Sequence, residues 1–299
     1  MGARNRASTR ELGELLRTYR EAAGLTMREL GERIGRNLTS LHRIETGVRG
    51  ATSESEVVHY MAACGASPKD VLRAIDVCRE TTEYRGYWLS PHDRWMSDSL
   101  RSFIFHESRA SKTVIYESEL IPGLLQTEPY VRALFARVDM PDEGRTALIQ
   151  TRLARQHVMF RNNPAKFTFF IQERALKLEV GDYRIMAEQL LAMLFFADRW
   201  NISIRIVPAK ARELALFGGP FQLLAYDRCP TLAYLDGPFG GVFLEEPKYV
   251  APFLKLNREL AGIALDAGES RALIASLADE YDRSEGSWDD TWKVAQEQL

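Results

Sequence analysis

The first 80 residues form a series of short amphipathic stretches, most of them followed by a glycine. Apolar side chains recur every three or four positions, the spacing that places them on one face of a helix. This apolar stripe consists of Leu12, Leu15, Leu16, Tyr19, Leu30, Ile34, Leu41 and Ile44. The glycines stand where helices are expected to end, at Gly24, Gly35, Gly47 and Gly65. The pattern predicts five short helices around one small core.

Helix start signals occur in the same region. Ser8, Thr26 and Ser53 are each followed three positions later by a glutamate. In that arrangement the hydroxyl and the carboxylate can each accept a backbone N–H that the first turn leaves unpaired. Asn37 can cap a further helix, and Ser67 precedes a proline, which suits the first helical position. We therefore expect helices to begin at these five residues.

Residues 37–46 are predicted to form a helix with one apolar and one polar face. At about 100° per residue, Leu41 and Ile44 can point inward together. Thr39, His42 and Arg43 then lie on the outer arc, and Leu38 and Ser40 flank it. A turn at Gly35 joins this helix to its predecessor, which is the geometry of a helix-turn-helix that reads the major groove of DNA. The alternative is a merely solvated helix in a small bundle.

Beyond the segment ETTEYRG, residues 80–86, the pattern is that of a larger domain. Segments rich in β-branched and aromatic residues cover 167–173, 202–208, 221–227, 231–237 and 241–246, and short turns separate the last three. Helical patterns cover 92–109, 126–137, 142–161, 183–200, 247–264 and 269–281. The sequence thus predicts an all-α bundle over residues 1–80 and an α+β domain with a mostly antiparallel sheet over residues 84–299.

Composition narrows the class of protein. A chain of 299 residues with 45% hydrophobic content can build a sizeable core, so disorder throughout is not expected. The three cysteines have no CxxC spacing, and the N-terminus has no apolar run of the kind found in signal peptides. No apolar run is long enough to cross a bilayer. These features are typical of a cytoplasmic protein with free thiols.

The net charge of −2 conceals a difference between the two ends of the chain. Residues 1–50 contain ten arginines and six glutamates, a surplus of four positive charges, so the remainder carries −6. A basic N-terminal region suggests a polyanion as its partner, and an acidic body suggests a partner of another kind.

The segment from Leu12 to Gly50 resembles the phage-repressor (XRE-type) helix-turn-helix family. The resemblance rests on Gly24, Leu25, Thr26, Glu29, Leu30, Gly35, Ile44, Glu45 and Gly47. It implies that Leu38, Thr39 and Arg43 face base edges, and His42 on the same arc joins them. It also implies an internal ion pair between Arg20 and Glu45.

Phosphate contacts are expected around the reading helix. The resemblance implies them for Asn37 and Ser40, and Met27 stands where the family usually has a phosphate-binding glutamine. We expect the basic residues near this surface to contact phosphate as well. The full set of expected phosphate contacts is Arg4, Arg6, Met27, Arg28, Asn37, Ser40 and Arg49.

The body resembles the C-terminal domain of actinobacterial two-domain regulators related to WhiJ, also described as antitoxin-like. The motifs that carry this resemblance are, in order, YESELIPGLLQTEPYVRAL, RLARQHVMF, QERALKLEVGDYRIMAEQL, VPAKARELALFGGPFQLL and ALDAGESRALI. The resemblance implies a DNA-binding regulator, frequently encoded beside a small protein that binds it. It supplies no catalytic residues.

Catalysis, a metal site and a cofactor are not expected. His92, His106 and His157 have no partner at metal-ligand spacing, and the sequence has no phosphate loop or nucleophile elbow. The segment IPGLLQTEPY leaves two interpretations open. It is either a structural corner or part of a ligand or peptide groove. The candidate groove residues are Gln126, Tyr130 and Arg132, with Leu190 and Leu194 as further partner contacts.

The sequence as a whole favours a sequence-specific DNA-binding transcriptional regulator. We expect a homodimer, because a single helix-turn-helix module of about 70 residues buries little surface on DNA. Its C-terminal domain would bind a small protein, encoded by an adjacent gene, or a ligand. The alternative is an antitoxin-like interaction protein that sequesters a small partner, with DNA binding secondary.

Overall fold

The computed structural model describes residues 6–48, 53–82, 87–91, 98–211, 219–237 and 240–296. The chain divides into two compact units. Unit 1 consists of Met1–His92, Ser97–Arg109 and Ala225–Val250, and unit 2 of Asp93–Met96, Ala110–Leu224 and Ala251–Leu299. The N-terminal helices thus share a unit with segments from the later part of the chain. The sequence domains 1–80 and 84–299 stay a prediction.

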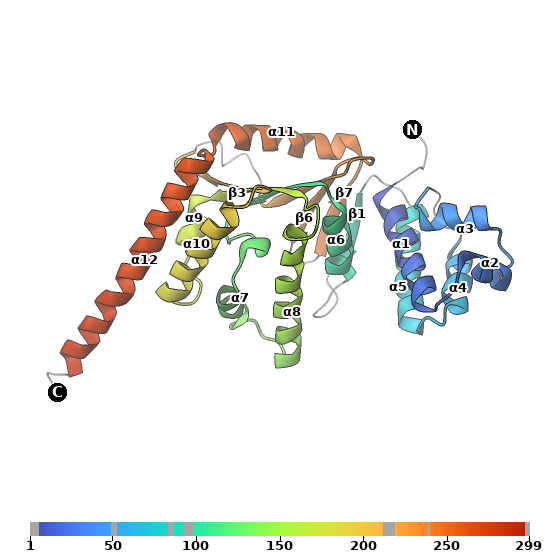
Figure 1. Ribbon diagram of the computed structural model, residues 1–299, viewed down its shortest axis with the longest axis horizontal. Coiled ribbons are helices and arrows are strands. Elements are labelled where there is room, and N and C mark those ends of the chain that lie inside the picture. Colours follow the sequence, from blue (N-terminus) through green and yellow to red (C-terminus); the bar gives the residue numbers. More distant parts are fainter. Residues whose placement is uncertain are drawn as a thin grey trace. The chain divides into compact units, whose positions relative to one another are not determined.

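Five helices form the N-terminal part of unit 1, as the sequence predicts. They are α1 (Ala7–Ala22), α2 (Met27–Ile34), α3 (Leu38–Glu45), α4 (Glu54–Ala63) and α5 (Pro68–Thr82), drawn in blue to cyan in Figure 1. The apolar stripe supplies much of their common core, which includes Leu12, Leu16, Leu30, Leu41 and Ile44. Burial of such side chains is the main force that holds short helices together.

Four of the five expected caps are present. The Thr26 hydroxyl accepts from the Glu29 N–H at 3.2 Å while the Glu29 carboxylate accepts from the Thr26 N–H at 2.8 Å. Asn37, Ser53 and Ser67 accept from the backbone N–H three residues on. These bonds satisfy donors that helix starts leave free.

The expectation that Ser8 caps the first helix was wrong. Helix α1 begins two residues earlier than a Ser8 cap would place it, at Ala7, and its N-cap Arg6 makes no side-chain cap. The Ala7 N–H instead donates to Oε1 of Glu245, at 2.5 Å. A carboxylate more than 200 positions away therefore replaces the local hydroxyl, which no local pattern could indicate.

Unit 1 also contains an antiparallel sheet and one further helix. The strand order is β1 (Tyr87–Pro91), β7 (Gly240–Leu244) and β6 (Leu232–Gly237), with both pairs antiparallel. Helix α6 (Asp98–Arg109) packs on these strands, with the ring of Phe103 centred 4.4 Å from that of Tyr234. The expected helix start at residue 92 lies outside the described residues.

The strands of unit 2 follow the order β5 (Phe221–Ala225), β2 (Lys112–Glu117), β3 (Lys166–Gln172) and β4 (Ile202–Val207). The β2–β3 and β3–β4 pairs are parallel. Parallel neighbours require long crossovers, and helical segments provide them. Helices followed by an α+β domain are the fold class that the sequence predicts. The parallel part of the sheet was not anticipated.

Most helices of unit 2 lie where the sequence predicts them, but the short helices at 123–125 and 173–177 were not predicted, and the last helix continues to Gln296 instead of ending at 281. The helices are η1 (Gly123–Leu125), α7 (Glu128–Phe135), α8 (Asp142–Arg155), η2 (Gln156–Met159), α9 (Glu173–Lys177), α10 (Tyr183–Ala197), α11 (Pro247–Ile263) and α12 (Ala267–Gln296). Figure 1 draws α11 above the sheet and α9 and α10 below it. The ring of Phe253 on α11 lies 5.3 Å from that of Phe221 on β5, which fixes α11 to its face.

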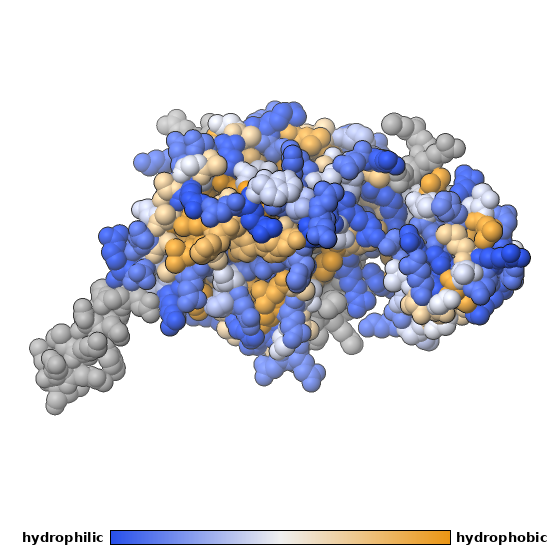
Figure 2. All heavy atoms as spheres, in the orientation of Figure 1, coloured by the Kyte–Doolittle hydropathy of each residue, from blue (hydrophilic) through white to orange (hydrophobic). Residues whose placement is uncertain are grey.

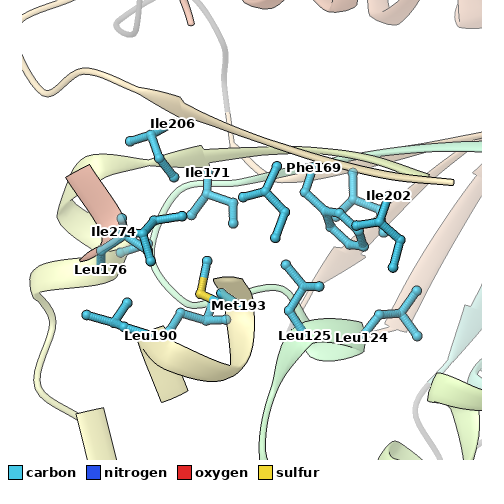
Figure 3. Packing of buried hydrophobic residues seen from close by; sticks show 14 of the residues in the cluster. Leu124, Leu125, Phe169, Ile171, Leu176, Leu190, Met193, Ile202, Ile206 and Ile274 are labelled. Atoms are coloured by element: carbon cyan, nitrogen blue, oxygen red, sulfur yellow. The ribbon is translucent and has the colours of Figure 1, made fainter. Parts of the chain in front are cut away.

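The core of unit 2 lies between the sheet and α10. In Figure 3, Leu190 and Met193 point from α10 toward Ile171 on β3, and Ile274 of α12 closes one side. Leu124 and Leu125 of η1 approach the same core. These side chains are almost completely buried, so α10 is fixed to the sheet by its inner face.

The edge strand β4 is covered within unit 2. The Ile206 N–H donates to the Ser270 hydroxyl at 2.9 Å, and the Ile206 carbonyl accepts from the Leu265 N–H at 2.9 Å. The Arg205 guanidinium donates to three carbonyls at the end of α11, those of Ala261, Ala264 and Leu265. A cation there complements the negative end of a helix, and the bonds to Ile206 close this end of the strand edge to another strand.

Candidate nucleic-acid interface

Helices α2 and α3 are joined by a tight turn. Gly35 closes α2 in the left-handed conformation, with φ of 67°, which a glycine adopts without a steric penalty. Asn37 then starts α3, because its side-chain oxygen accepts from the Ser40 N–H at 2.8 Å. The turn is therefore defined at both ends by residues whose conformations favour it.

Helix α3 lies very close to α1. A Cβ atom added at Gly13 on α1 would lie 2.4 Å from the carbonyl oxygen of Ile44, so only glycine fits there. Leu41 and Ile44 are buried in the common core, as the helical pattern predicts. These contacts fix the inner face of α3 and leave the opposite face toward solvent.

A buried ionic cluster fixes the end of α3. Nε and Nη2 of Arg20 donate to Oε1 and Oε2 of Glu45 at 2.7 and 2.8 Å, and Nη1 of Arg20 donates to the Leu25 carbonyl at 2.8 Å. The Tyr60 hydroxyl also donates to Oε1 of Glu45, at 2.6 Å. Hydrogen bonding to Glu45 raises the pKa of Arg20, and burial raises the pKa of Tyr60. Tyr60 was missed in the sequence because only the fold brings α4 to Glu45.

The outer face of α3 carries the expected base-reading residues. Leu38 is 52% exposed, and Thr39, His42 and Arg43 are exposed as well. Among the residues that the structure describes, no carboxylate forms an ion pair with Arg43. By contrast, Arg17 pairs with Glu21, and Arg36 with Glu56. The guanidinium of Arg43 is thus available to an external acceptor.

The expected phosphate contacts differ in their surroundings. Arg28 is exposed and pairs with Glu32 at 3.2 Å, while Arg6 and Met27 are half-buried. Asn37 is exposed, with its side-chain oxygen used as the α3 cap, and Ser40 is half-buried beside it. Arg4 and Arg49 lie outside the described residues.

The candidate groove residues of the body are mostly inside the protein. Gln126 is buried, donates to the Ile121 carbonyl at 2.7 Å and accepts from Arg152 at 2.9 Å. Tyr130 is buried too, whereas Arg132 is exposed and pairs with Glu128. The geometry favours the structural corner over the groove.

The two leucines proposed for the partner surface also lie inward. Leu190 is fully buried, and Leu194 is half-buried against the same core. The exposed apolar positions of α10 are instead Leu191 and Phe195, which follow the exposed Arg184 and Glu188 on the same face. A helical pattern alone did not distinguish these two faces, because the second half of α10 is apolar on both.

The histidines considered for catalysis have different environments. His106 is buried in unit 1, with Nε2 at 3.4 Å from Oε2 of Glu11, and burial lowers its pKa. His157 is exposed in η2, and His92 lies outside the described residues. Within the described ranges, no group of three His, Cys, Asp or Glu side chains could hold a metal ion.

No helix in the part of the chain that the structure describes has both the length and the apolar character needed to span a bilayer.

Comparison with known families gives one match in the N-terminal part of the chain and another in the body. A model of a helix-turn-helix domain matches residues 11–74, which include α2, the turn and α3. A model described as a domain of unknown function (DUF5753) matches residues 100–276, more than half of the chain. No match was found among curated proteins. The chain therefore belongs to the DUF5753 family and carries a helix-turn-helix domain at its N-terminus.

Proposed function

We propose that this protein is a transcription regulator that binds a specific DNA sequence with helix α3. The observation that carries this function is the exposed outer face of α3, on which Arg43 lacks an ion-pair partner among the described residues. The helix-turn-helix match covers this face. A rigid helix with free hydrogen-bonding groups near its N-terminus suits the major groove.

Base reading is assigned to Leu38, Thr39, His42 and Arg43. Arg43 can donate two hydrogen bonds to O6 and N7 of one guanine, the commonest specific contact in the major groove. Thr39 can hydrogen-bond either a donor or an acceptor, and Leu38 suits the methyl group of thymine. The exposure of all four side chains supports this assignment.

Phosphate binding is assigned to the residues around this face. Arg28, exposed at the start of α2, is the strongest of these because its pairing with Glu32 is a surface ion pair that phosphate can replace. Arg6, Met27, Asn37 and Ser40 complete the described set, and Arg4 and Arg49 are proposed from the sequence alone. Such contacts position the protein without reading sequence.

Homodimerisation and control by a partner are proposed for the rest of the chain. One helix-turn-helix module gives limited specificity, and two modules reading adjacent half-sites give more. The resemblance to XRE-type and WhiJ-related regulators supports control through the C-terminal domain by a small protein or ligand. An antitoxin-like binder with secondary DNA contact is disfavoured, because it gives the exposed hydrogen-bonding face of α3 only a minor role.

The direct experiment measures binding of the full chain to DNA from its own promoter, before any partner is added. Fluorescence anisotropy at several salt concentrations should show binding that weakens as salt rises, since phosphate contacts release counterions. Binding to promoter DNA should exceed binding to random DNA of equal length by at least about 10³-fold. Equal affinity for both, or none for either, would contradict the proposed function.

A further inference from the structure

Exposed aromatic side chains occur at one place in the described structure. Phe160, Phe195 and Trp200 are 41%, 76% and 72% exposed, and every other described Phe, Tyr or Trp side chain is at least partly buried. All three belong to the end of α10 and the segment after η2, within unit 2. In Figure 2, apolar side chains form an orange band over the region where Figure 1 draws α10. We call Phe160, Phe195, Arg199 and Trp200 the aromatic corner.

The two chain segments of the aromatic corner are held side by side. Nδ2 of the buried Asn201 donates to the carbonyls of Met159 and Ala165, at 3.2 and 3.0 Å. The ring of Phe160 stacks on that of Phe196, with centroids 6.0 Å apart. The corner is thus built into the fold before any ligand arrives, which reduces the entropy cost of binding.

The aromatic corner is also cationic. The guanidinium carbon of Arg199 lies 4.7 Å from the centre of the Phe160 ring, and no described carboxylate forms an ion pair with Arg199. The adjacent Asp198 is neutralised by Arg271, at 2.6 Å. Arg161 and Lys166, which are exposed in the segment after Phe160, carry charge of the same sign.

Aromatic side chains and arginine together are the residues most enriched where proteins bind one another tightly. Single exposed apolar residues are ordinary, but a contiguous group of large ones marks an interaction surface. The charge selects the partner, because a cationic surface favours carboxylates. Double-stranded DNA offers phosphates but has no apolar group on its backbone to cover Phe195 or the neighbouring exposed Leu191.

We propose that the aromatic corner docks a partner protein through an acidic segment with an apolar anchor. The anchor covers Phe195 and Trp200, and carboxylates of the segment lie beside Arg199. This inference rests on the DNA-binding function proposed above, for which it names the surface through which a second protein acts on the regulator.

The test uses the full chain and three labelled synthetic peptides of equal length. The first combines leucine with glutamate, the second replaces each glutamate with lysine, and the third replaces each leucine with serine. Fluorescence anisotropy should show that the first peptide binds at least tenfold more tightly than the other two and dissociates as salt rises. Equal binding of all three peptides, or none by the first, overturns the proposal.

Matched variants locate the binding surface. Phe195→Ser and Arg199→Glu should each weaken binding of the leucine–glutamate peptide about tenfold or more. The controls Leu254→Ser and Lys255→Glu make the same kinds of change on α11, where both residues are exposed, and should change the affinity less than twofold. Thermal unfolding should show all four variants folded, because the altered side chains are on the surface. If the α11 variants weaken peptide binding as much as the variants in the aromatic corner, the proposal is overturned.

Two further measurements test whether DNA or a second copy of the chain occupies the aromatic corner, and whether DNA binding is independent of it. If double-stranded DNA displaces the peptide, or if Phe195→Ser converts a dimer to a monomer in sedimentation, the corner serves DNA or a second copy and the proposal fails. Phe195→Ser and Arg199→Glu should bind promoter DNA like the parent chain. Loss of DNA reading with peptide binding intact would instead count against the proposed function alone.

Discussion

Arg20 and Glu45 form a bidentate ion pair that ties α1 to the last turn of α3, with N–O distances of 2.7 and 2.8 Å. Both side chains are buried, and the remaining Nη1 of Arg20 is satisfied by the Leu25 carbonyl. The resemblance to XRE-type proteins implied this pair, and the structure shows what it does. It fixes the end of the helix on which the candidate base-reading residues lie.

Arg20→Ala should destabilise the N-terminal helices by about 3 to 5 kcal/mol, because it leaves the Glu45 carboxylate buried beside only Tyr60. Urea unfolding monitored by helical circular dichroism measures the change. Arg17→Ala removes an exposed pair with Glu21 and should change the stability little, because solvent screens such a pair. An Arg20→Ala variant that unfolds like the parent but loses DNA binding would show that Arg20 contacts DNA instead.

Tyr60→Phe should cost about 1.5 to 3 kcal/mol, since it removes a hydrogen bond to a charged group while keeping the ring in the core. The same urea measurement applies. Combined with Arg20→Ala, the effects should not add, because both side chains bind the same carboxylate. Additive effects would place the two residues in independent roles.

The stability of unit 1 should fall as the pH drops below about 6.5, the ordinary pKa of histidine. Burial lowers the pKa of His106 in the folded chain, although Glu11 opposes this shift. The unfolded state therefore binds a proton more readily, so the stability present above the unfolded pKa is lost as the pH falls toward the folded pKa. Hydrogen exchange of the α6 amides between pH 7.5 and 5.5 measures the loss.

His106→Gln should flatten this pH dependence, whereas His59→Gln, which changes an exposed histidine on α4, should leave it as in the parent. Parallel pH profiles of the parent chain and His106→Gln would show that other groups control the stability.

Arg28→Ala should flatten the salt dependence of DNA binding by about 0.9 units of log K per log salt, as expected for one lost phosphate contact. The loss of affinity should be nearly equal on promoter and random DNA, because phosphate carries no sequence information. Anisotropy titrations over a range of salt concentrations give both slopes. A slope equal to that of the parent chain would remove Arg28 from the interface.

Local patterns predicted the helical part of the fold well. Thr26, Asn37, Ser53 and Ser67 cap helices where the sequence indicates, because capping depends on residues only three positions apart. Ser8 failed for the opposite reason, since its place is taken by Glu245, a residue distant in sequence. Local rules work where the competing partners are also local.

The sheet was only partly predictable. Strand β2, Lys112–Glu117, was missed, although four of its side chains in a row are buried. Its sequence KTVIYE shows no alternation of apolar and polar residues, because the strand is buried on both faces. The pairing with β3 that stabilises it is made across the long crossover through α7 and α8. The sequence also could not show which face of α10 is exposed. Leu190 and Leu191 are equally apolar, and only packing in the core of unit 2 buries Leu190.

Base reading by α3 is tested by measuring how Arg43→Ala binds two different DNAs. The affinity of the full chain for promoter DNA should fall by about 1 to 3 kcal/mol, or roughly 5- to 150-fold, with much less loss on random DNA of equal length and at equal salt. Arg17→Ala, an exposed arginine on α1, serves as the control and should leave both affinities within twofold of the parent. Equal losses on the two DNAs for Arg43→Ala would contradict base reading by α3 and reduce Arg43 to a phosphate contact.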